Sequence, residues 1–349
     1  MSFKRLDAED FVVSADAIQG VAWSTGVPTL ESFFTSSTQK TSTTGDYYLS
    51  IYQEPGTLDE AEVQFDIAYG NKFGSGSTPY DSIYVDRTPS STTYGQYRSM
   101  ILEDENAIFI TGVGSTGQTT PCSSTTGSTA VEMEDFWVIS PDRARYKQSL
   151  FPGTFNLTLS GSGGLLELTD NSNDVSVQTF LGSSRVFQIV SGSNGSGISG
   201  GGYTSNSGSY GLFFPDIATI LLNCVAISSS IGVEANTASP LTNGVNQEIL
   251  FTAISGGASF QLNSEETVTS DYVFIRSRNA EFNYSENPSF ISGSTGEVIY
   301  NSFINNPQVY MTTVGMYNDA NELLAVAKLS RPLLKDFTKE SLVRVKLDF

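Results

Sequence analysis

Carboxylates are the groups in this 349-residue chain that could do chemistry, because the sequence contains no histidine. That absence excludes Ser-His-Asp and Cys-His catalysis and His-ligated zinc. Two acidic residues facing one cleft, as in glycoside hydrolases, remain feasible. The candidate clusters are Glu103-Asp104-Glu105 and the group Glu132, Glu134 and Asp135. A solvated acidic face accounts for both clusters more simply, so we expect no catalytic residues and predict that the protein is not an enzyme.

A cation loop is the second chemical candidate. The run Asp170-Asn171-Ser172-Asn173-Asp174 places oxygen ligands at alternating positions, as calcium prefers. It lacks the central glycine and the final glutamate of an EF-hand loop. Because Asx-rich turns are more common than calcium sites, we expect a turn, with no metal and no cofactor. The glycine-rich run 192–202 lacks the Gly-Lys-Ser/Thr ending of a phosphate loop, and we expect a flexible loop there.

Positive charge is concentrated at the C-terminus of the chain, whose net charge is −19. Residues 328–349 carry a formal charge of +3, so the rest of the chain carries −22. The basic residues of this block are Lys328, Arg331, Lys335, Lys339, Arg344 and Lys346. A basic terminus on an acidic body predicts a docking surface for an acidic neighbour, such as another copy of the chain. The alternative is that these side chains solvate a sheet edge and oppose aggregation, and both interpretations stay open at this point.

Composition favours strands over helices. Hydrophobic residues make up 39% of the chain and charged residues only 16%, and Ser, Thr, Asn and Gly replace the missing charge. These residues have poor helix propensity and offer competing local hydrogen bonds. The chain is also longer than the roughly 250–300 residues at which a single core stops growing. We therefore predict a mainly β, multi-domain protein, with β-sandwich or barrel-like domains and a few short helices.

Hydrophobic periodicity places the elements. Alternating or continuous apolar runs predict strands over residues 63–69, 136–139, 155–159, 186–190, 217–222, 309–317, 323–329 and 343–349. One helical face is predicted by the spacing of Tyr94, Tyr97, Met100 and Ile101. Ser91 or Thr92 would cap that helix. The Gly-, Ser- and Thr-rich segments 112–129 and 191–209 are typical of long loops.

The charge pattern divides the chain into three predicted parts. Residues 1–147 would form an N-terminal β-rich domain, and residues 148–275 a charge-poor β domain in which Arg185 is the only basic residue. Residues 276–349 would supply strands that pack back on the first domain. The runs 135–140 and 271–276 each contain Asp, an aromatic and apolar residues up to Ile. Similar strands at entry and exit indicate that 148–275 is inserted into a host sheet, although coincidence explains them equally well.

Several further classes are disfavoured. Cys122 and Cys224 have no metal-ligand spacing, and two reduced thiols in a cytoplasm are a simpler interpretation than the one possible disulfide. The start of the chain, Met1–Asp7, has no apolar core of a signal peptide, and no run approaches the ~20 apolar residues of a membrane span. The net charge of −19 argues against nucleic-acid binding. We expect neither a membrane nor a nucleic-acid partner.

Five segments resemble virion structural proteins of large contractile-tailed bacteriophages (myoviruses), including those that infect marine cyanobacteria. The segments are Gly95–Arg98, Arg143–Leu157, Leu168–Val175, Glu281–Pro288 and Val314–Phe349, and the last is the most specific. The resemblance implies a tail or baseplate component of the virion, assembled in the host cytoplasm and held by contacts with other virion proteins and with copies of itself. It carries over no catalytic residue.

Two other functions compete with this one. A receptor-binding or adhesion protein of the tail tip would contact a host-surface glycan through residues 148–275, where Tyr and Asn occur in long loops. A carboxylate-based glycan-degrading enzyme would need two acidic side chains in one cleft. The first is the main alternative to a structural role, and the second ranks below it.

Overall fold

The computed structural model describes residues 8–21, 34–35, 46–55, 58–59, 61–112, 130–175, 178–198, 208–238, 244–285 and 288–348. Strands account for 45% and helices for 17% of it, which confirms the expected mainly β, multi-domain class. The chain forms two compact units. We call residues 20–266 the inner unit, and residues 1–19 together with 267–349 the terminal unit.

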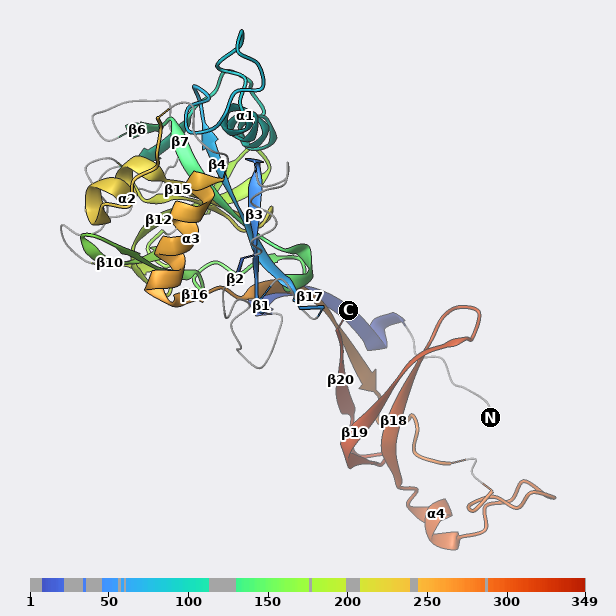
Figure 1. The fold of residues 1–349 in the computed structure, drawn as a ribbon. Coiled ribbons are helices and arrows are strands. Elements are labelled where there is room, and N and C mark those ends of the chain that lie inside the picture. The colour runs from blue at the N-terminus through green and yellow to red at the C-terminus, as the bar shows by residue number, and fades with distance from the viewer. Residues whose placement is uncertain are drawn as a thin grey trace. The chain divides into compact units, whose positions relative to one another are not determined.

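A large antiparallel sheet that curls organises the inner unit (Figure 1). Its strand order is β16-β9-β10-β12-β14-β15-β7-β4-β3-β2, and β11 and β13 also pair with β12. The bounds are β2 Phe34–Thr35, β3 Tyr48–Tyr52, β4 Val63–Asn71, β7 Asp135–Pro141, β9 Asn156–Gly161, β10 Gly164–Asp170, β11 Thr179–Leu181, β12 Ser184–Ser193, β13 Ser196–Gly197, β14 Gly211–Phe214, β15 Thr219–Asn223 and β16 Ser259–Gln261. Strands β5 (Phe109–Gly112) and β6 (Ala130–Met133) pair separately.

The two faces of this sheet form two separate hydrophobic cores. In β7, Trp137 and Ile139 belong to one core, whereas Phe136 and Val138 belong to the other. Successive side chains leave opposite faces of a strand, so a fully apolar run can serve both cores. Helices α2 (Cys224–Ile231) and α3 (Val245–Gly257) contribute to the first core, and α1 (Pro89–Leu102) contributes to the second.

The predicted helix around residues 94–101 is present, but its cap differs from the expectation. The N-cap of α1 is Thr88, whose hydroxyl accepts a hydrogen bond from the Ser91 amide at 3.2 Å. The Ser91 hydroxyl in turn accepts from the Thr88 amide at 3.0 Å. Pro89 can occupy the first turn because its missing N–H has no partner to lose there. The expected cap at Ser91 or Thr92 is therefore wrong, since the helix begins earlier.

The observed units have other bounds than the three predicted parts. The expected boundary at 147/148 lies inside the inner unit, because β7 pairs with β15 through Ile139 and Ile220 in one sheet. The segment that interrupts another unit in sequence is 20–266. Residues 267–349 form a unit with residues 1–19.

The terminal unit contains a small sheet and a ribbon. The sheet has the order β1 (Phe11–Val21), β17 (Ser264–Ser277), β20 (Ser341–Asp348), and β17 begins in the inner unit, where it pairs with β8 (Ser149–Leu150). Strands β18 (Val309–Tyr317) and β19 (Leu323–Lys335) form a separate two-stranded ribbon (Figure 1), and α4 (Asn301–Asn305) is a short helix. The predicted C-terminal alternation is confirmed, because Val343 and Val345 are buried while Arg344 and Lys346 are exposed.

Some expectations fall where the structure gives no description. In the loop expected over 112–129, Gly112 ends β5 and residues 113–129, with Cys122, lie outside the described residues. In the segment 191–209, the first residues extend β12 and Ser196–Gly197 form β13, so this part is a hairpin and not a loop. Residues 199–207 are again outside the described part.

Candidate assembly surface

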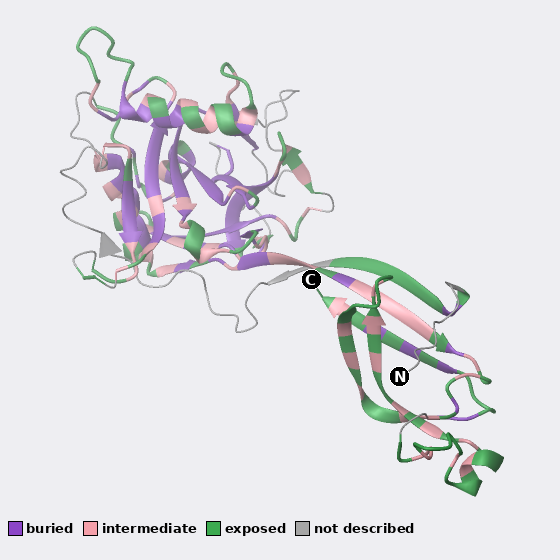
Figure 2. Ribbon diagram, turned by 90° about the vertical axis from the view of Figure 1, so that its right-hand side faces the viewer, coloured by how far each residue is buried: buried purple, intermediate pink, exposed green. Residues whose placement is uncertain are grey.

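The terminal unit has almost no apolar interior. Within its described residues, the buried apolar side chains are Val343 and Val345. The buried polar residues are Asp10, Ser270, Ser277, Asn283, Lys335, Asp336 and Ser341. Figure 2 shows the contrast, with the sheet of the inner unit largely purple and the strands of the terminal unit largely pink and green. Such a unit gains little free energy from apolar burial within one chain.

Large apolar side chains of the terminal unit lie on its surface instead. On the ribbon, Tyr310, Leu324 and Val326 are exposed by 66%, 68% and 58%. Other exposed apolar residues of this unit are Phe11, Val12, Val13, Phe282, Tyr284, Ile299, Tyr300, Ile304, Tyr317, Leu323, Phe337 and Leu342. A two-stranded hairpin is at best marginally stable in water without a third strand or a packed face. Clustered exposed apolar residues mark surfaces that bind other molecules.

The six basic residues predicted to dock a partner are distributed over β19, the link after it and β20. Lys328 and Arg331 are exposed on β19, and Arg344 and Lys346 on β20. Lys346 pairs with Asp348 at 2.7 Å, and the Arg344 guanidinium lies 5.5 Å from the centre of the Tyr272 ring. Lys339 is exposed, with its Nζ 3.9 Å from an Asp336 carboxylate oxygen.

Lys335 has a different position from the other five basic residues. Its Nζ donates hydrogen bonds to Asn279 O at 3.0 Å, Asn283 Oδ1 at 2.8 Å and Asp336 O at 3.0 Å. The side chain is shielded from solvent, and this burial lowers the pKa of Lys335. Three acceptors satisfy its three donors. The ammonium group of Lys335 is thus bound inside the unit, and contact of Lys335 with a partner stays a prediction.

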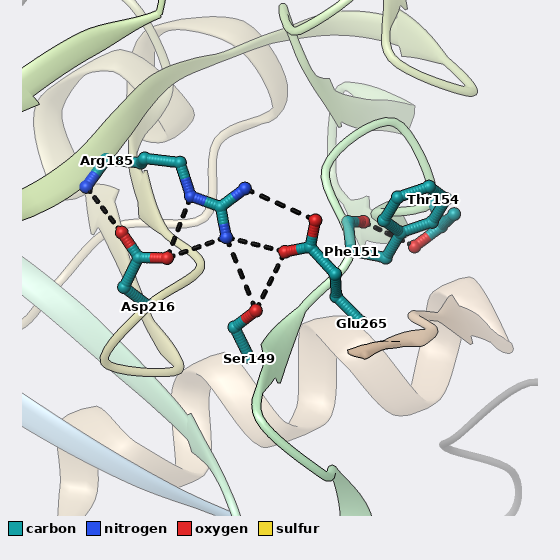
Figure 3. Close-up of polar contacts among 6 residues, drawn as sticks. All are labelled: Ser149, Phe151, Thr154, Arg185, Asp216 and Glu265. Atoms are coloured by element: carbon teal, nitrogen blue, oxygen red, sulfur yellow. Dashed lines mark hydrogen bonds and ion pairs between the residues drawn. The ribbon is translucent and has the colours of Figure 1, made fainter. Parts of the chain in front are cut away.

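Arg185 anchors a buried polar network in the inner unit (Figure 3). Its Nη2 lies 2.5 Å from Glu265 Oε2 and 2.6 Å from Asp216 Oδ1, and its Nε donates to Asp216 Oδ1 at 2.8 Å. The Ser149 hydroxyl donates to Glu265 Oε2 at 2.8 Å. Burial disfavours the charged guanidinium, but its hydrogen bonds with Glu265 and Asp216 outweigh this and raise the pKa of Arg185. The network fastens β12, the turn before β15 and the first residues of β17, which is a structural role.

The loop predicted as a possible cation site is a turn with an internal carboxylate. Asp170 is buried and accepts hydrogen bonds from the amides of Gly153 at 2.8 Å and Ser172 at 2.9 Å. Burial raises the pKa of Asp170 despite these bonds. Among the described residues, no cluster of acidic or cysteine side chains has the arrangement of a metal site.

The two acidic clusters have unlike environments. Glu103, Asp104, Glu105, Glu132 and Glu134 are exposed, whereas Asp135 is buried. The Tyr69 hydroxyl donates to Asp135 Oδ2 at 3.4 Å, and the buried free thiol of Cys224 also interacts with Asp135. Burial raises the pKa of Asp135 to about 6. The sequence does not single out Asp135 from its exposed neighbours, except by its position at the start of an apolar run.

A shallow groove lies beside α3 in the inner unit. Its volume is about 540 Å³, and polar side chains line it together with apolar ones: Ser160, Ser162, Glu234, Glu248 and Thr252 with Val233, Ile249 and Ala253. Hydroxyl and carboxylate groups of this kind can hydrogen-bond sugar hydroxyls. The sequence carried no signal for it, because its residues come from three separate segments.

Comparisons with models of known protein families, with curated proteins and with solved structures find no match. In the part of the chain that the structure describes, no helix has both the length and the apolar character of a membrane span.

Proposed function

We propose that this protein is a structural subunit of the virion of a contractile-tailed bacteriophage, a component of the tail baseplate that acts through contacts between subunits. The observation that carries the proposal is the terminal unit, which exposes large apolar side chains on its strands and buries mainly polar ones. The resemblance of its C-terminal block to myovirus virion proteins supports the same role. The protein would be assembled in the host cytoplasm, and its partners would be other virion proteins and copies of itself.

Assembly explains the composition of the terminal unit in physical terms. Neighbouring subunits cover apolar surface and strand edges that a monomer leaves in water. Each Å² of apolar surface covered contributes roughly 25 cal/mol, so side chains such as Leu324 and Val326 would stabilise the assembled state. Charge favours the same part of the chain. The formal charge of the terminal unit is −3, so the inner unit carries −16 of the total −19. Subunits that meet through the terminal units bring the least like charge together.

Cryo-electron microscopy of intact virions tests the proposal. We expect density for this chain in the baseplate, with the terminal unit covered by neighbouring subunits. Mass spectrometry of purified virions supplies the control for presence and copy number. Absence of the chain from purified virions, or a terminal unit that is uncovered in every copy, would overturn the proposal.

The groove beside α3 favours a second candidate, a receptor-binding protein of the tail tip that contacts a host-surface glycan. Glu234 is exposed and lines the groove together with hydroxyl groups. On this candidate the full-length chain binds host surface polysaccharide in calorimetry, and Glu234→Gln weakens binding at least about tenfold. The matched control is Glu297→Gln, an exposed carboxylate of the terminal unit. No binding by the unaltered chain excludes this candidate.

A further inference from the structure

The outer face of the β18–β19 ribbon carries an apolar row. Gly315 lies opposite Val326 in the register, and a Cβ at Gly315 would lie 2.9 Å from the Tyr317 ring. Tyr317 pairs with Leu323, and Leu324 is the extra residue of a bulge next to this pair. Tyr317, Leu324 and Val326 are all exposed, whereas the alternate residues Val314 and Met316 are half-buried.

Opposite charges flank this row along the strands. Lys328, opposite Thr313, lies at one end of the row and is exposed. The turn between the strands lies at the other end and carries Asp319 and Glu322, which are also exposed. Two hydrogen bonds join the ends of the turn: the Glu322 amide donates to Asn318 Oδ1 at 2.8 Å, and the Asn318 side chain donates to Glu322 Oε2 at 2.7 Å. Along the strands, this face therefore begins with basic Lys328, continues with the apolar row and ends at the acidic turn.

We infer that this face, defined by Tyr317, Leu324, Val326, Lys328 and Glu322, binds the same face of a second copy of the chain about a two-fold axis. In a two-fold contact each patch meets itself in reverse order. The apolar rows then cover each other, and Lys328 of each copy lies beside the acidic turn of the other. In this arrangement each charge meets an opposite charge of the other copy. These pairs attract the two copies and also fix how their strands are aligned. An unrelated partner would not require this order.

The inference rests on the proposed function, because it names the partner of the same terminal unit. Its test uses sedimentation velocity of the full-length chain over a range of concentrations. We expect concentration-dependent dimers, and we expect Lys328→Glu and Glu322→Lys each to raise the dissociation constant at least about tenfold, since each change places like charges together twice per dimer. Leu324→Asp should weaken the dimer at least as strongly.

Mixing supplies the decisive control. In an equimolar mixture of Lys328→Glu and Glu322→Lys, both charge pairs of the heterodimer are again opposite, so dimers should return. The double variant in one chain should also dimerise. Leu165→Asp on β10 is the matched apolar control, because Leu165 and Leu324 are both 68% exposed. It should leave the dimer unchanged.

Three results would overturn the inference: a monomer at all concentrations up to about 100 µM, single variants that dimerise normally, or a mixture that stays monomeric. The function is tested separately, by the presence of the chain in virions. A chain found in the baseplate whose ribbon contacts a different protein refutes the self-contact and keeps the proposed function.

Discussion

The ammonium group of Lys335 donates a hydrogen bond to Asn283 Oδ1 over 2.8 Å, between residues 52 positions apart. Both residues are buried, and the same ammonium also binds the carbonyl oxygens of Asn279 and Asp336. This relationship ties the segment after β17 to the end of β19. It acts as a polar core in a unit with few apolar contacts.

Replacing Lys335 should therefore weaken the terminal unit itself. Lys335→Met removes the donor to the buried Asn283 Oδ1, whereas Asn279 O and Asp336 O still accept from Asn283 Nδ2 and the Lys339 amide. We expect a loss of about 1–3 kcal/mol in the stability of that unit. Hydrogen exchange followed by mass spectrometry would show faster exchange in β19 and β20. Lys339→Met, at an exposed position, is the control and should leave exchange unchanged. Equal effects of the two changes would contradict the assigned role of Lys335.

The Arg185–Glu265 pair should behave as a coupled buried unit. Arg185→Met leaves the buried carboxylate of Glu265 uncompensated, and we expect a loss of about 3–5 kcal/mol in chemical denaturation. Adding Glu265→Gln to that variant should restore part of the loss, because the second charge is then removed as well. The exposed pair of Arg276 and Glu340 supplies the comparison, and Arg276→Met should have a far smaller effect. Additive losses in the double variant would argue against coupling.

Asp135 should make the inner unit less stable as pH rises. Its pKa is about 6 in the folded state, above its ordinary value of 3.8, so the folded state binds the proton more tightly. The stabilisation from that proton is complete below pH 3.8 and is lost as pH rises to about 6. Asp135→Asn should remove this dependence and raise stability at pH 7.5 by about 3 kcal/mol, at 1.36 kcal/mol per pKa unit. Glu105→Gln, at an exposed position of the same unit, should leave the pH profile intact, and a profile unaffected by Asp135→Asn would refute the assignment.

Two glycine-to-alanine changes in the inner unit should have opposite signs. Gly211 has φ +153°, and a Cβ there would lie 1.9 Å from the Leu221 carbonyl oxygen. Gly211→Ala should cost about 1–3 kcal/mol through backbone strain and this overlap. Gly95 lies within α1, and a Cβ there meets nothing within 4 Å. Gly95→Ala should raise stability by about 0.5–1 kcal/mol, and thermal denaturation of both variants checks the two signs.

Local pattern was enough to predict the class of fold and many of its elements. Composition predicted a mainly β protein, and the period-two alternation of Val343, Arg344 and Val345 predicted which side chains of β20 are buried. Both depend on near neighbours in the chain. The cap of α1 was missed by a few residues because Pro89 allows an earlier start than the apolar spacing indicates.

Tertiary structure alone decided the interiors and the unit boundaries. The six basic residues at the C-terminus look alike in sequence, yet Lys335 is buried because its acceptors at Asn279 and Asn283 come from a distant segment. Arg185 likewise forms a hydrogen bond with Glu265, which lies 80 positions away in the sequence. Burial of a charge depends on hydrogen-bond partners that folding brings together. Neither the local charge density nor the hydrophobic periodicity of the sequence shows which residues become those partners. Local sequence pattern therefore predicts the class of fold, many of its strands and the net charge, whereas folding determines which of those charges remain on the surface.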